Sequence, residues 1–184
     1  YLKGRTSEQK EQYQRAKKGG DAIAATKVVK RVLKKGVVEN LKSILGDREG
    51  VIVPVLQPEG TSYANMLPVS FAEVLENVLP AKALYSIARI KGKPNTGASG
   101  SDRSQNIIEF DGDIESGMPV ILVDDTFTSG QTLMALYDHL TRKGHEVVAM
   151  TTLASGRYGK GLRPTSKKQQ ALLDKSGLTS EELE

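Results

Sequence analysis

The chain of 184 residues contains no cysteine, no tryptophan and only two histidines. The lack of cysteine excludes disulfide bonds, thiolate metal sites and a cysteine nucleophile. His139 and His145 are too few for a histidine-rich metal site, and we expect both to be surface or packing residues. No apolar run approaches the length of a membrane span and no signal peptide is visible at Tyr1, so we expect a cytoplasmic protein without a membrane partner.

The charge of the chain is unevenly distributed. Residues 1–48 carry 13 Lys and Arg against 5 Asp and Glu, whereas residues 49–184 carry 13 against 17. Such a basic segment suits nucleic acid or an acidic partner, but a solvated helical face is the favoured interpretation. We therefore predict a basic helical extension over 1–48 and the main domain over 49–184. The first residue is not Met and a helix cap stands close to the last residue, which indicates a piece of a longer protein.

Apolar runs alternate with amphipathic stretches along the chain, a pattern typical of a parallel sheet with helical crossovers. We predict an α/β fold with a doubly wound, mainly parallel sheet of about four or five strands. Pro54 indicates an edge strand or a strand end, Asp21 is a candidate helix cap, and Gly36 is predicted to end that helix. Strands are predicted at 51–56, 82–90, 107–110, 120–123 and 146–153, and helices at 5–18, 21–35, 37–45, 68–79, 131–143 and 166–175.

The most informative segment is VILVDDTFTSGQT at 120–132. Its four aliphatic residues predict a buried parallel strand, and Asp124 and Asp125 come at the carboxyl end, where open α/β sheets bind ligands. Residues 126–130 predict a turn whose backbone N–H groups can surround a phosphate. The helix that begins near Gln131 directs its positive end at the same place. A sugar phosphate is therefore the predicted ligand.

This segment resembles the PRPP-binding motif of the type I phosphoribosyltransferases. The resemblance implies the core fold of that family, with a variable hood for which residues 154–184 or the amino-terminal helices are candidates. It also implies that Asp124 and Asp125 bind the ribose hydroxyls of PRPP and that magnesium arrives on PRPP without a direct protein ligand. The implied ligands of the 5-phosphate are Thr126, Phe127, Thr128, Ser129, Gly130, Gln131 and Thr132.

The loop after the first predicted strand stands where this family has its pyrophosphate loop. Gln57, Gly60 and Thr61 are its candidate contacts. Family members often carry a basic residue there, but residues 51–81 contain no Lys or Arg. This departure from the family pattern puts the catalytic efficiency in question.

The long polar stretch at 91–106 resembles the mobile flap that closes over PRPP in this family. A solvated loop tip is an equally weighted interpretation. The cations that could reach the pyrophosphate from this side are Arg89, Lys91, Lys93 and Arg103.

The acceptor is only partly constrained by the sequence. The third residue after the acid pair is usually Asp in 6-oxopurine transferases, whereas here it is Thr128, which cannot act as the same base. Arg157 and Tyr158, after the last predicted strand, are candidates for contacts with the acceptor. The segment at 51–56 with Asn65 also faintly resembles the competence-protein-F-like members of the family.

Two functions therefore compete. The first is a phosphoribosyltransferase of nucleotide metabolism that uses PRPP, magnesium and a nucleobase-like nitrogen acceptor, for which a homodimer is a plausible assembly. The second is a PRPP- or nucleotide-binding regulatory domain with weak or no activity, which contacts nucleic acid through its basic amino-terminal region. The flap-like cations favour the enzyme, and the absence of a cation at 57–62 favours the regulator.

Overall fold

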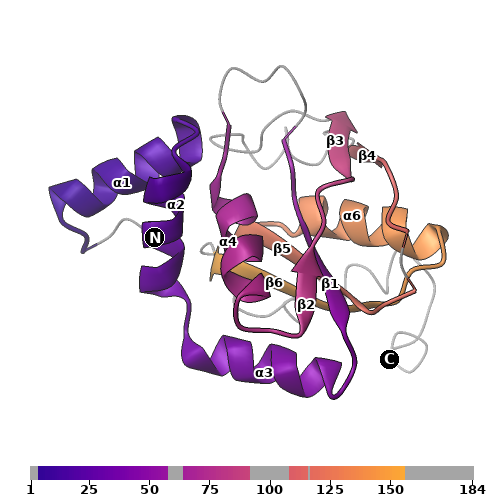
Figure 1. The fold of residues 1–184 in the computed structure, drawn as a ribbon. Helices are drawn as coiled ribbons and strands as arrows, with labels where there is room; N and C mark the ends of the chain where they lie inside the picture. Colours follow the sequence, from indigo (N-terminus) through magenta and orange to yellow (C-terminus); the bar gives the residue numbers. More distant parts are fainter. Residues whose placement is uncertain (1–3, 58–63, 92–107, 116, 156–184) are drawn as a thin grey trace, which may run out of the picture.

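The computed structural model describes residues 4–57, 64–91, 108–115 and 117–155, which form an α/β fold (Figure 1). Within these residues, no helix is both long and apolar enough to span a membrane. The helices are α1 (Ser7–Lys18), α2 (Ala22–Val32), α3 (Lys35–Leu45), α4 (Leu67–Glu76) and α6 (Gln131–Arg142). The strands are β1 (Gly50–Pro54), β2 (Ala81–Ala83), β3 (Ala88–Lys91), β4 (Glu109–Asp111), β5 (Val120–Phe127) and β6 (Val147–Ser155).

Four strands form one parallel sheet in the order β2-β1-β5-β6, and β3 pairs with β4 in a separate antiparallel ribbon. From β1 the chain passes through α4 to β2 on one side, and from β5 it passes through α6 to β6 on the other. The strand order therefore reverses between β1 and β5. Ligands of doubly wound sheets bind at the carboxyl ends of the strands beside such a reversal.

Helices cover both faces of the sheet, which confirms the predicted doubly wound architecture. On one face Ile121 and Val123 pack with buried residues of α2, α3 and α4. On the other face Val120 and Leu122 pack with Leu136 and other residues of α6, and with the β3–β4 ribbon. The alternation follows from the two-residue repeat of a strand, and it also determines which face each carboxylate of the motif meets.

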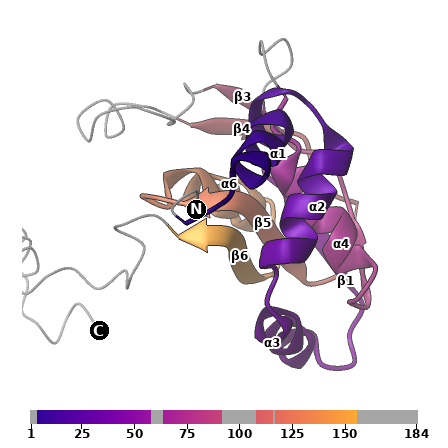
Figure 2. The same ribbon diagram turned by 90° about the vertical axis from the view of Figure 1, so that its left-hand side faces the viewer.

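The three amino-terminal helices pack against the rest of the domain. Asp21 caps α2, as predicted, by accepting a hydrogen bond from the N–H of Ala24 at 2.8 Å. Helix α1 lies beside α2, and α2 lies beside α4 (Figure 2). The buried Ala16 of α1 joins a small apolar cluster with α2 and Leu67, and its carbonyl oxygen accepts from the N–H of Met66 at 3.0 Å. The C-terminal turn of α1 is thereby attached to the segment that precedes α4.

Several predicted boundaries differ from those in the structure. The predicted strand at 82–90 is two strands, because the chain leaves the parallel sheet after Ala83 and then pairs with β4. Pro54 is the last residue of an interior strand, so the strand-end alternative was right and the edge alternative was wrong. Gly36 lies inside α3, because Leu33 already has an extended conformation that ends α2.

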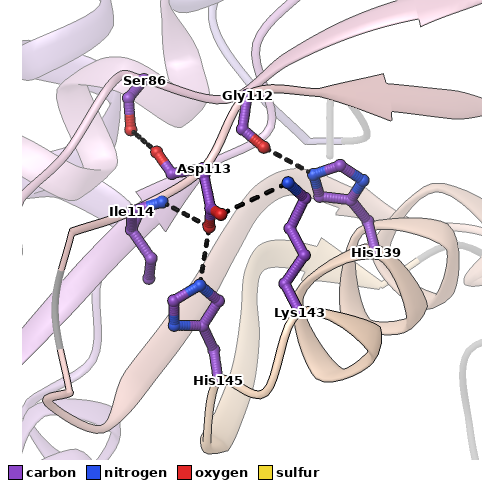
Figure 3. A network of polar contacts seen from close by, with 7 residues as sticks. All are labelled: Ser86, Gly112, Asp113, Ile114, His139, Lys143 and His145. Atoms are coloured by element: carbon purple, nitrogen blue, oxygen red, sulfur yellow. Dashed lines mark hydrogen bonds and ion pairs between the residues drawn. The ribbon is translucent and has the colours of Figure 1, made fainter.

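A polar network is centred on Asp113, in the connection between β4 and β5 (Figure 3). The Asp113 carboxylate accepts from His145 at 2.7 Å and forms an ion pair with Lys143 at 3.3 Å. His139 donates to the carbonyl oxygen of Gly112 at 2.8 Å. Both histidines thus pack against the connection between β4 and β5. This network ties that connection to the end of α6 and the start of β6.

The network predicts an acid-dependent loss of stability. The hydrogen bond from His145, with the N–H of Ile114 and Lys143, lowers the pKa of Asp113 to about 2 from an ordinary value of 3.8. The folded state therefore favours the ionised carboxylate, and this contribution is present above about pH 4 and is lost as the pH falls through about 2. We expect Asp113→Asn to have a lower melting temperature than the wild type at neutral pH and a smaller difference at about pH 2. Thermal unfolding across this pH range measures the difference in melting temperature. A difference that does not change with pH would contradict the prediction.

Candidate functional site

The two acidic residues of β5 lie just beyond the end of the neighbouring strand. β1 ends at Pro54, which is in register with Val123, so Asp124 and Asp125 continue past β1 while β5 remains paired with β6. β5 extends to Phe127, further than predicted, because the long strand β6 supplies partners as far as Ser155. The carboxylates therefore stand at the reversal of strand order, where the geometry favours a ligand.

Asp125 is buried on the face covered by α2, α3 and α4, with 8% of its surface exposed. Its Oδ2 atom accepts from Lys17 Nζ at 2.6 Å and from Asn65 Nδ2 at 3.1 Å. Asn65 is itself held, because its Oδ1 atom accepts from the N–H of Leu67 at the start of α4. The groups that donate to Asp125 therefore come from two segments, α1 and the residues before α4, which are both far from β5 in the sequence.

Asp124 points to the opposite face, because successive side chains of a strand alternate. One of its oxygens accepts from the N–H of Asp125 at 2.7 Å. Burial, together with the negative charge of Asp125, raises the pKa of the Asp124 carboxyl well above its usual value, and Lys17 and Arg89 oppose that rise. Asp124 is therefore poised to donate a hydrogen bond when it is protonated and to accept one when it is ionised.

The loop after Asp125 forms a small concave site at the amino end of α6. Residues 126–133 line it together with Asp124. Gly130 occupies the N-cap position with a φ of 76°, and no side chain caps the helix there. The first N–H groups of an α-helix have no partner within the helix, so those of α6 are directed at this concave site. An anion is the ligand that such a helix end favours.

A buried cation lies near the site on the side of the β3–β4 ribbon. Arg89 is 3% exposed, and its Nη2 atom donates to Gln57 Oε1 at 2.7 Å. Gln57 follows β1 and Arg89 belongs to β3, so the structure joins a predicted loop residue to a predicted flap residue. The loop at 57–62 has no cation of its own, but Arg89 supplies positive charge beside it.

The residues predicted for the site lie partly within the described ranges and partly outside them. Gln57, Arg89 and the residues 124–132 converge on the carboxyl ends of β1 and β5. Lys91 ends β3, and only its backbone is described. The remaining predicted residues lie outside the described residues: Gly60, Thr61, Lys93, Arg103, Arg157 and Tyr158, together with nearly all of the hood candidate at 154–184.

Lys17 is, with Asn65, a site residue that the sequence did not predict. Its side chain is only 16% exposed, and the ammonium group lies 5.7 Å from the centre of the Tyr13 ring. Burial opposes its charge, but Asp125 outweighs that effect and raises the pKa of Lys17. In the sequence it is one of many cations in a polar helix, and no local pattern separates it from Lys18.

Comparisons of the sequence find two bacterial relatives. The chain is 31% identical over 166 residues to protein TraN of Escherichia coli. The matched region covers 90% of the chain and 37% of TraN. It is 30% identical over 131 residues to an uncharacterized protein of Haemophilus influenzae, which covers 71% of the chain and 29% of that protein. The chain thus spans roughly a third of the length of these relatives. No family model matches it.

Comparisons of the structure find phosphoribosyltransferases at low similarity. A purine phosphoribosyltransferase of Pyrococcus horikoshii has a TM-score of 0.42 and 18% identity, over 69% of this chain and 73% of its own. An adenine phosphoribosyltransferase has a TM-score of 0.44 and 14% identity, over 78% of this chain and 74% of its own. At these values no residue role is carried over, so the assignment of the site depends on the residues of this chain.

Proposed function

We propose that this domain binds PRPP with magnesium and transfers its phosphoribosyl group to a nucleobase-like nitrogen acceptor, with release of pyrophosphate. One observation carries the proposal: two adjacent carboxylates stand past the end of β1, and the chain then turns into the amino end of α6, which no side chain caps. Carboxylates accept from sugar hydroxyls, and helix N–H groups donate to phosphate. A sugar phosphate has both kinds of group within one molecule.

Each part of the site then has a chemical role. Asp124 and Asp125 accept from the ribose hydroxyls, and residues 128–132 bind the 5-phosphate. The acceptor nitrogen forms a bond to ribose C1 while the bond from C1 to the pyrophosphate oxygen breaks, and the electron pair leaves with pyrophosphate. Arg89 is placed to stabilise the negative charge that grows on that leaving group. The positive charge of Arg89 also favours the ionised form of Asp124 and opposes the rise in its pKa.

The phosphate oxygens of PRPP are ligands of the kind that magnesium prefers. Within the described ranges, no cluster of three or more His, Asp or Glu side chains could hold a metal ion by itself. Magnesium binds phosphate oxygens of substrates, so PRPP would carry the ion, while Asp124 and Asp125 would bind the ribose hydroxyls without being ligands of the metal. When bound, the ion would neutralise charge on the pyrophosphate.

A ligand-binding regulatory domain of low activity is the second candidate. The observation in its favour is that residues 51–81 contain no Lys or Arg, although a departing pyrophosphate requires positive charge. A nucleic-acid partner of the basic region 1–48 would belong to this candidate. Binding to nucleic acid would then weaken steeply as the salt concentration rises.

Calorimetric titration of PRPP into the protein, with magnesium and then with EDTA, tests the proposal. The same samples are assayed for pyrophosphate release with a panel of bases. We expect binding that weakens with EDTA, and release with at least one base. Binding without release for every base would favour the regulatory domain, and the absence of PRPP binding would refute the proposed transferase.

A further inference from the structure

We propose that Lys17, on a helix outside the sheet, is a positioning residue of this site: its ammonium group holds Oδ2 of Asp125, so that the second carboxylate oxygen is oriented to accept from a sugar hydroxyl. This inference rests on the proposed function. It makes α1, from the basic extension, a working part of the site. Neither the motif at 120–132 nor the relatives assign such a role to this helix.

The position of Lys17 is determined by backbone contacts. The carbonyl oxygen of Ala16 accepts from the N–H of Met66, and the side chain of Ala16 is fully buried. This contact places Lys17, the next residue of α1, beside Asn65, the residue before Met66. Both side chains then donate to the same oxygen of Asp125. The C-terminal turn of α1 and the start of α4 thus form one support for this carboxylate.

The geometry leaves Asp125 able to bind a ligand. Among the described residues, both hydrogen bonds of its side chain reach Oδ2, so Oδ1 is left for a hydroxyl group. A carboxylate has room for about four hydrogen bonds. Lys17 therefore orients the Asp125 carboxylate and leaves it able to accept further hydrogen bonds. Lys17 does not take the place of the ligand.

The charge of Lys17 matters because two carboxylates are adjacent. Asp124 and Asp125 repel each other when both are ionised, and burial adds to the cost. The charged groups that oppose this repulsion are Lys17 from α1 and Arg89 from β3, with Tyr13 beside Lys17. Lys17 opposes the rise in the pKa of Asp124, so without Lys17 this carboxyl should retain its proton to a higher pH and accept fewer hydroxyl hydrogen bonds near neutrality.

The experiment compares Lys17→Met with Lys17→Arg and with Lys18→Met, whose residue is exposed one position further along α1. PRPP binding with magnesium is titrated at about pH 6.5 and about pH 9. We expect Lys17→Met to bind roughly tenfold more weakly at the lower pH and within about threefold of the wild type at the higher pH. Lys17→Arg should restore most of the affinity at the lower pH, and Lys18→Met should match the wild type.

Three outcomes would overturn the inference: unchanged affinity in Lys17→Met, an equal loss at both pH values, or tighter binding, which would mean that Lys17 competes with the ligand. A measurement without PRPP separates this inference from the proposed function. The side-chain carboxyl carbon of Asp124 is followed by NMR as the pH changes, and Lys17→Met should move its titration to higher pH. If the wild type does not bind PRPP, the proposed function fails, whereas an unmoved titration refutes the role of Lys17.

Discussion

Asp124→Asn combined with Asp125→Asn is expected to weaken PRPP binding by roughly 100-fold or more, because each change removes a charged acceptor worth about 1.5–3 kcal/mol. An amide oxygen still accepts a hydrogen bond, but it carries no charge. Calorimetric titration with magnesium measures the change. Unchanged affinity in a folded double variant would refute the assignment of the site.

The single variants separate binding from folding. Asp125→Asn leaves Lys17 without its carboxylate, which should cost about 1–3 kcal/mol of folding free energy. Asp124→Asn should behave in the opposite way. The pKa of Asp124 is raised in the folded state from 3.8, so ionising it costs stability as the pH rises from about 4 toward the raised pKa. We expect Asp124→Asn to be at least as stable as the wild type at about pH 8 and still to bind PRPP weakly.

Gly130→Ala is expected to destabilise the protein by roughly 2–4 kcal/mol and to weaken binding of the 5-phosphate. The backbone of Gly130 is left-handed, with a φ of 76°, which costs a residue with a side chain about 1–2 kcal/mol. A Cβ atom there would also lie 2.8 Å from the ring of Phe127. That ring would have to move, and it lines the concave site proposed for the 5-phosphate.

Gly144→Ala is the matched control for this second effect. Gly144 also has a positive φ, of 89°, but a Cβ atom there meets nothing within 4 Å. The control should therefore show the backbone cost of about 1–2 kcal/mol alone. Chemical denaturation of both variants and titration with ribose 5-phosphate measure the difference. Equal loss of stability and equal affinity would mean that the contact with Phe127 is unimportant.

The sequence predicted those parts of the fold that depend on local pattern. Aliphatic runs identify β1 and β5 because strands buried on both faces need apolar residues at successive positions. Asp21 marks the start of α2 because capping is a property of a few neighbouring residues. The split between β2 and β3 could not be predicted, because it depends on which distant strand offers a hydrogen-bonding partner.

The candidate site divides in the same way. Asp124, Asp125 and the loop before α6 are contiguous, so the sequence alone determined their order, their place after a strand and the chemistry that they favour. Only the tertiary structure decided which side chains surround them. Lys17 and Asn65 donate to Asp125 because α1 docks on the segment before α4, and Arg89 binds Gln57 because β3 lies beside the end of β1. Such contacts depend on packing between distant segments, and no local pattern encodes them.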